Sequence, residues 1–102
     1  GALTLDLARH EARWPDAQPI RLSPLEMRLL QSLMRHAGHV LPADTLIARV
    51  WGPEGATRDM LKQLVYRLRS KLEPDPAAPQ LIENIPNVGY VMHTPDDPLS
   101  SA

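Results

Sequence analysis

The composition of this chain fits one small globular domain and excludes several classes of protein. Its 102 residues suffice for a single core, and the hydrophobic and charged fractions of 43% and 23% are ordinary. The absence of cysteine excludes disulfides and thiolate metal sites and fits a reducing cytoplasm. No apolar run approaches the roughly 20 residues of a membrane span. The net charge of −1 argues against avid non-specific binding to nucleic acid, because such binding grows with the number of phosphates neutralised.

Short strands are predicted at the start of the chain. Leucine alternates with polar residues there, at Leu3, Leu5 and Leu7. This alternation is typical of a half-buried strand. Residues 11–14 are able to pair with it, and a third strand ends at Leu22 after the turn-rich break at 15–19. We therefore expect a small antiparallel sheet before the first helix.

The first helix begins with a capping box. In this motif the Ser23 hydroxyl accepts from the amide of Glu26, and the Glu26 carboxylate accepts from the amide of Ser23. Pro24 occupies the first helical position, where its missing N–H costs nothing. Gly38 is expected to end the helix. Capping accounts for Glu26, so no catalytic role is assigned to it. The predicted buried face consists of Leu25, Leu29, Leu30, Leu33 and Met34.

Two further helices are predicted, at 43–51 and at 57–73. Pro42 stands where the first of them would need a capping hydroxyl, whereas Thr57 is able to cap the second. The second of them has an apolar stripe at helical spacing, formed by Leu61, Leu64, Val65, Leu68 and Leu72.

The polar face of the predicted helix at 57–73 is basic. It holds five of the chain's eleven basic residues, namely Arg58, Lys62, Arg67, Arg69 and Lys71. Only Asp59 and Glu73 oppose them, so the segment is +3 while the rest of the chain is −4. Arg and Gln on such a face suit the DNA major groove, where Arg reads guanine and Gln reads adenine. The alternative is an ordinary solvated face, since Lys and Arg favour helices in any case.

A β-hairpin is predicted after the third helix. Prolines between residues 74 and 79 break the helix, and strands follow at 81–84 and 89–92. Strands, three helices and a hairpin are the order of a winged helix-turn-helix, an α+β fold, expected over residues 3–93. In that fold the third helix enters the major groove, and the hairpin, or wing, lies against the adjacent minor groove or backbone. The polar residues 94–102 are expected to form a disordered tail.

Four motifs in order resemble one family. They are L-S-P-L-E-M-R-L-L at 22–30, V-W-G at 50–52, R-L-R-S-K-L at 67–72 and V-G-Y at 88–90. Each motif is weak evidence by itself, but their order and spacing together resemble the OmpR/PhoB-type effector domain of bacterial two-component response regulators. The resemblance covers about residues 3–92.

The resemblance implies a mechanism. A phosphorylated N-terminal receiver domain dimerises, and two effector domains then bind head-to-tail on direct-repeat half-sites of double-stranded DNA. The receiver would lie outside this chain. The chain itself is expected to be cytoplasmic and to need no cofactor. It is expected to be a monomer in isolation and to pair head-to-tail on DNA. Family members contact RNA polymerase through the loop between the second and third helices, which corresponds here to Gly52, Pro53, Glu54, Gly55 and Ala56.

The resemblance also assigns candidate DNA contacts. The base-facing positions of the third helix correspond to Met60, Lys62, Gln63, Tyr66 and Arg67. Arg69, together with Arg58, is assigned to phosphates. Trp51 either approaches the DNA backbone or anchors the edge of the core. The Tyr66 ring either contacts a thymine methyl group or sugar, or covers a leucine.

The predicted wing departs from the family pattern. The family's Thr-Val-Arg-Gly corresponds here to the four residues from Asn84 to Asn87, with Pro86 in place of the arginine. Proline offers neither charge nor a backbone donor. The loss of one such cation should cost about 1 kcal/mol of DNA-binding free energy. It should also lower the slope of log affinity against log salt concentration by about one. Asn87 is able to adopt the positive φ of a glycine, and both asparagines remain candidate DNA contacts.

Other functions have less support in the sequence. His36 and His39 have a spacing that would suit zinc, but no further ligand lies nearby, and no nucleophile or phosphate loop indicates an enzyme. Two alternatives stay open. One is a winged-helix module for protein interaction that has lost DNA binding, which the −1 charge and Pro86 favour. The other is the DNA-binding segment of a larger regulator without a phosphorylated receiver.

Overall fold

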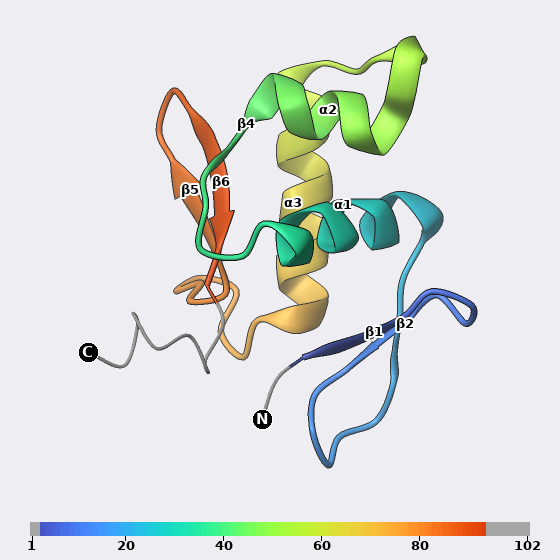
Figure 1. The fold of residues 1–102 in the computed structure, drawn as a ribbon. Helices are drawn as coiled ribbons and strands as arrows, with labels where there is room; N and C mark the ends of the chain where they lie inside the picture. Colours follow the sequence, from blue (N-terminus) through green and yellow to red (C-terminus); the bar gives the residue numbers. More distant parts are fainter. Residues whose placement is uncertain (1–2, 94–102) are drawn as a thin grey trace.

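The computed structural model describes residues 3–93, which form three helices between two small sheets (Figure 1). The predicted tail at 94–102 lies outside the described residues. No helix within 3–93 is long and apolar enough to cross a membrane. The elements in order are β1 (Thr4–Asp6), β2 (Glu11–Arg13), β3 (Ile20–Arg21), α1 (Pro24–Arg35), β4 (Leu41–Pro42), α2 (Ala43–Trp51), η1 (Gly52–Glu54), α3 (Arg58–Leu72), β5 (Ile82–Ile85) and β6 (Gly89–Met92). The predicted winged helix-turn-helix fold is confirmed.

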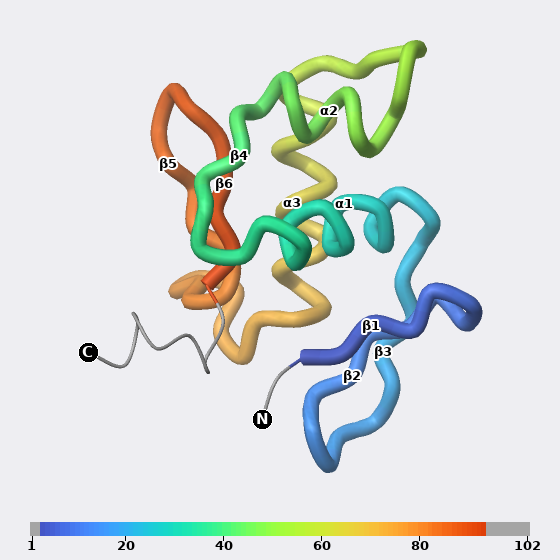
Figure 2. Tube along the Cα trace, in the orientation of Figure 1, coloured from blue at the N-terminus to red at the C-terminus, as the bar shows by residue number. Residues whose placement is uncertain are grey.

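The N-terminal sheet is antiparallel, in the order β1-β2-β3 (Figure 2). Leu5 pairs with Ala12, which is fully buried, and Leu3 is also buried. The predicted alternation is wrong at Leu7, which is 46% exposed. The reason is that β1 ends at Asp6, and the chain then turns toward β2 with His10 at a φ of 55°.

Helix α1 has the predicted capping box. The Ser23 amide donates to Glu26 Oε1 over 2.7 Å, and the Glu26 amide donates to Ser23 Oγ over 3.1 Å. The helix ends at Arg35, with His36 as its C-cap. Gly38 lies beyond the end at a φ of 85° and donates its amide to the Met92 carbonyl over 2.8 Å.

Glu26 has a second role that the cap did not reveal. It is buried, and its Oε1 also accepts from Lys71 Nζ on α3 over 2.6 Å. Burial by itself raises the pKa of Glu26, but the hydrogen bonds from Lys71 and Ser23 and the Lys71 charge outweigh it and lower the pKa below its ordinary value. The expectation that capping accounts fully for Glu26 is therefore wrong, because the carboxylate also joins α1 to α3.

The predicted stripe of α3 is the centre of the core. Thr57 caps the helix by accepting from the Met60 amide over 3.1 Å. Figure 1 shows α1 crossing α3, with α2 packed near the N-terminal half of α3. All five leucine and valine positions of the stripe are buried, namely Leu61, Leu64, Val65, Leu68 and Leu72.

The second sheet contains a strand that was not predicted. Its order is β4-β6-β5, so the hairpin of β5 and β6 is joined by β4, in which Leu41 pairs with Tyr90 and Pro42 with Gly89. Gly89 is needed here because the backbone of β4 passes so close. A Cβ added to it would lie 1.9 Å from the Leu41 carbonyl oxygen and 2.9 Å from Pro42 Cα. Any side chain at this position would therefore push β4 away from β6.

We predict that Gly89→Ala destabilises the domain. The added methyl group meets backbone, which has little freedom to yield, so the free energy of unfolding should fall by about 2 kcal/mol or more. Urea unfolding followed by circular dichroism measures this change. Val88→Ala is the control, since the Val88 side chain is 47% exposed and its truncation should have little effect. Equal stability of the Gly89→Ala variant and the unmodified chain would show that β4 does not constrain this position.

Candidate nucleic-acid interface

The outer face of α3 is exposed along the N-terminal two thirds of the helix. It consists of the five predicted base-facing residues, Met60, Lys62, Gln63, Tyr66 and Arg67. Helical periodicity places them opposite the buried stripe. The Tyr66 ring is 68% exposed, so it does not serve mainly to cover a leucine. The face therefore presents two cations, an amide, a phenol and a thioether to solvent.

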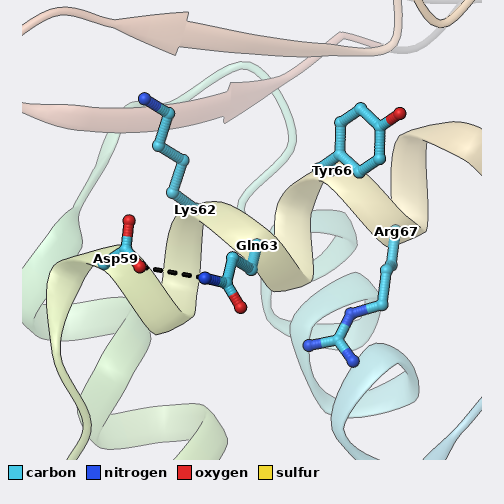
Figure 3. A pocket seen from close by; sticks show the side chains of 5 residues that line it. All are labelled: Asp59, Lys62, Gln63, Tyr66 and Arg67. Carbon is cyan, nitrogen blue, oxygen red and sulfur yellow. Dashed lines mark hydrogen bonds between the residues drawn. The ribbon is translucent and has the colours of Figure 1, made fainter.

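Four of these residues form a shallow, open pocket together with Asp59 (Figure 3). Gln63 Nε2 donates to Asp59 Oδ2 over 2.9 Å, one helical turn away. Lys62 and Arg67 extend to either side and form no ion pair within residues 3–93. Their charges therefore remain available to an external anion.

The wing lies beside the N-terminal half of α3. A second shallow groove is lined by Arg58 and Lys62 from α3 and by Asn84 and Asn87 from the hairpin, among other residues. Asn87 has a φ of 64°, so it takes the left-handed conformation expected of it. The structure thus brings both wing asparagines next to the basic helix.

Arg58 stands at the first position of α3 and is exposed. Its Nη2 lies 3.3 Å from Asp44 Oδ2 on α2, and the two side chains are 66% and 80% exposed. An exposed pair of this kind contributes little to stability and exchanges readily with other partners. The pair therefore leaves Arg58 free to meet a phosphate.

Arg69 has a structural partner that the sequence did not reveal. Its Nε and Nη2 donate to the Ile82 carbonyl oxygen over 3.1 and 2.9 Å, and its guanidinium carbon lies 6.0 Å from the centre of the Tyr90 ring. Burial raises the pKa of Tyr90, and the Arg69 charge opposes that rise. Arg69 thus joins α3 to the hairpin, a structural role that the sequence did not assign to it.

Trp51 and the following loop lie at the C-terminal end of α2. Trp51 is half-buried and packs against the core, which is one of the two roles left open for it. The loop expected at Gly52–Ala56 is partly a 3₁₀ turn, Gly52–Glu54. Gly52 and Gly55 have φ angles of 73° and 69°. Pro53 and Glu54 are exposed, so the loop is accessible.

No group of three or more His, Cys, Asp or Glu residues within 3–93 is arranged to hold a metal ion. The described site is instead a convex helix face with a hairpin at its side. A capped core of three helices, a C-terminal hairpin and an exposed basic third helix define a winged-helix domain of the kind that transcription regulators use.

A match to a family model identifies the family of this chain. Residues 17–92 match the family model "Transcriptional regulatory protein, C terminal". The chain therefore belongs to this family, the OmpR/PhoB-type winged-helix effector domains of response regulators, which are transcription regulators and not enzymes.

Relatives cover most of the chain. It is 41% identical over 92 residues to the sensory transduction protein RegX3 of Mycolicibacterium smegmatis, covering 88% of this chain and 40% of RegX3. It is 36% identical over 89 residues to the KDP operon transcriptional regulatory protein KdpE of Escherichia coli, covering 86% of this chain and 39% of KdpE. The chain thus spans about 40% of the length of these relatives.

Solved structures share the fold. The DNA-binding domain of Escherichia coli CadC superposes with a TM-score of 0.81 at 27% identity, covering 93% of this chain and 89% of that chain. The Klebsiella pneumoniae RstA DNA-binding domain in complex with the RstA box gives a TM-score of 0.77 at 27% identity, covering 91% and 92% of the two chains.

We predict that Arg69→Ala destabilises the fold, whereas Arg67→Ala does not. Arg69 loses two hydrogen bonds from a charged group to a partly buried carbonyl, which should cost about 2 kcal/mol. Arg67 is exposed, so its truncation should change the free energy of unfolding by less than about 0.5 kcal/mol. Parallel urea unfolding of the two variants measures both values. Equal stability of the two variants would rule out the structural role of Arg69.

Proposed function

We propose that this chain binds specific double-stranded DNA sequences with α3 in the major groove. The observation that carries the proposal is the exposed outer face of α3, where Lys62 and Arg67 flank Gln63 and their charges are free of ion pairs within 3–93. These residue types suit base edges, since arginine and lysine donate to guanine and glutamine pairs with adenine. The likeness to the RstA DNA-binding domain, which was solved in complex with the RstA box, supports binding to a specific DNA site.

The residues divide into readers and anchors. Lys62, Gln63 and Arg67 would read base edges, with apolar contact from Met60 and Tyr66 to thymine methyl groups or sugars. Arg58 would hold a phosphate at the start of α3. The family resemblance also gives Arg69 a phosphate role, which competes with its contact to Ile82. Asn84 and Asn87 would approach the neighbouring backbone from the wing.

The whole regulator would act by the mechanism of its relatives. RegX3 is named a sensory transduction protein, and the Mycolicibacterium smegmatis MtrA, 36% identical over 91 residues, is named a DNA-binding response regulator. We propose that this domain is the output of such a regulator in the bacterial cytoplasm, with a receiver domain outside this chain. Two copies would bind head-to-tail on direct repeats, and the Gly52–Ala56 loop would contact RNA polymerase.

The absence of basic residues from the turn of the wing favours one alternative. Between Asn84 and Asn87 the hairpin carries no basic residue, and the chain as a whole is −1. A wing without cations contributes less to phosphate binding, since each phosphate contact adds to affinity and salt dependence. The second candidate is therefore a module for protein interaction with little DNA affinity. The two candidates differ in whether DNA binding at low salt is measurable and sequence-dependent.

Selection from a random duplex library with the purified chain at low salt tests the proposal. We expect a short motif repeated about 10 to 11 base pairs apart, which is the spacing of two domains on one face of the duplex. A single unrepeated motif would support specific binding but contradict tandem binding. Recovery of no motif, together with salt-independent weak binding, would favour the interaction module.

We predict that Arg67→Ala and Arg58→Ala lower DNA affinity in different ways. Arg67→Ala should weaken the selected motif but not unrelated DNA, lowering the ratio of specific to non-specific affinity about tenfold. Arg58→Ala should weaken binding to all DNA sequences alike. It should also lower the slope of log affinity against log salt concentration by about one. Fluorescence anisotropy at several salt concentrations measures both effects.

The control for these variants is Arg9→Ala. Arg9 carries the same charge, lies beyond β1 and pairs only loosely with Asp6 at 3.9 Å. Its loss should leave both the affinity ratio and the salt dependence unchanged. An equal loss of affinity for the selected motif and for unrelated DNA in the Arg67 variant, as in the Arg58 variant, would contradict the division into readers and anchors.

A further inference from the structure

Asp59 was assigned to DNA recognition neither by the sequence pattern nor by the family resemblance. Asp59 lies in the first turn of α3 and is exposed, and it lines the same shallow pocket as Lys62, Gln63 and Arg67. An acidic side chain on a surface that meets DNA is unfavourable by charge alone. Its presence at the N-terminal end of the predicted reading face therefore calls for a role that offsets this cost.

The contact to Gln63 indicates that role. Asp59 Oδ2 accepts from Gln63 Nε2 over 2.9 Å, and the dashed line in Figure 3 marks this hydrogen bond. An ionised carboxylate only accepts, whereas a glutamine amide has both an acceptor and a donor end. The amide must therefore turn its nitrogen toward Asp59, since the flipped amide would bring two oxygens together. The Asp59 charge thereby selects one of the two amide orientations.

A fixed amide orientation has a consequence for base recognition. When Asp59 holds the N–H that is trans to Oε1, Gln63 still offers its Oε1 acceptor and the N–H cis to it, side by side. Adenine presents a matching pair in the major groove, the N6 donor and the N7 acceptor, whereas guanine presents two acceptors at N7 and O6. A held Oε1 thus pairs with adenine and is repelled by the O6 of guanine. A freely rotating amide distinguishes the two purines less well.

We propose that Asp59 is a positioning residue that holds the Gln63 amide so that α3 selects adenine and rejects guanine at one base pair of its operator. This rests on the proposed DNA-binding function and adds a specificity determinant to it. Holding the side chain in advance also lowers the conformational entropy lost when the amide pairs with a base. Lys62 and Arg67, which line the same pocket as Asp59, offset its repulsion of the phosphates.

The test compares selections from a random duplex library by the full chain and by its Gln63→Ala, Asp59→Ala and Asp59→Asn variants. Gln63→Ala should lose the preference for adenine at one position, which identifies the base that Gln63 reads. Asp59→Ala should keep the rest of the motif but accept guanine at that same position, lowering the adenine-to-guanine ratio about tenfold. Asp59→Asn has nearly the same size and allows either amide orientation, so it should relax the same position.

Two controls separate positioning from other effects. Asp6→Asn removes one negative charge from the N-terminal sheet and should leave the base preference unchanged at every position. Thermal unfolding by circular dichroism checks that the exposed Asp59 variants remain folded. If Asp59→Ala unfolds, Asp59→Asn, which retains the side chain's shape, serves as the deciding variant.

The outcomes distinguish this inference from the function on which it rests. Unchanged discrimination between adenine and guanine in both Asp59 variants would overturn the positioning role. A changed preference at a position that Gln63→Ala leaves untouched would also overturn it, because Asp59 would then contact a base itself. Both results would leave sequence-specific DNA binding intact. Failure of the unmodified chain to select any motif would instead reject the proposed function.

Discussion

The last turn of α3 is the constraint on which the rest of the structure depends. Glu73, which ends the helix, is buried, and its carboxylate accepts from the amides of Gln80, Leu81 and Ile82 at 2.9 to 3.0 Å. Arg69, one turn earlier, donates to the carbonyl oxygen of the same Ile82. A carboxylate and a guanidinium thus satisfy the polar groups of the backbone where β5 begins. Because both come from α3, the wing is held in a fixed position relative to that helix.

The same turn is tied to the other side of the domain. Lys71 Nζ donates to Glu26 of α1 and to the Arg21 carbonyl over 2.6 and 3.0 Å. Trp14 Nε1, just after β2, donates to the Leu72 carbonyl over 3.2 Å. The helix is therefore anchored at its C-terminal end by both sheets and by α1. Its N-terminal two thirds are held by the buried stripe and by the exposed Arg58–Asp44 pair, which leaves the opposite face free for a ligand.

The features that the sequence predicted are local in the chain. Ser23 and Glu26 form a cap three residues apart, Thr57 caps α3, and the stripe of α3 follows from helical spacing. The exposed reading face follows from the same periodicity.

Two features that were missed depend on residues distant in the chain. Strand β4 has only two residues, too few for a pattern, and Lys71 contacts Glu26 although 45 positions separate them. Arg69 was assigned to phosphate because its type and position suit that role, whereas its contact to Ile82 depends on how the hairpin folds back. Asp59 and Gln63 lie one helical turn apart, so helical spacing alone could have predicted their contact.

The exposed face of α3 and the adjoining wing are proposed to contact DNA together. The most direct test of this proposal is to record amide chemical shifts of the ¹⁵N-labelled chain while a selected duplex is added, with an unrelated duplex as control. We expect the largest shift changes at residues 58–67 and smaller ones at 84–88, and we expect weaker changes with the unrelated duplex. Changes centred on the N-terminal sheet, or none at 58–67 when the duplex is saturating, would contradict the proposal.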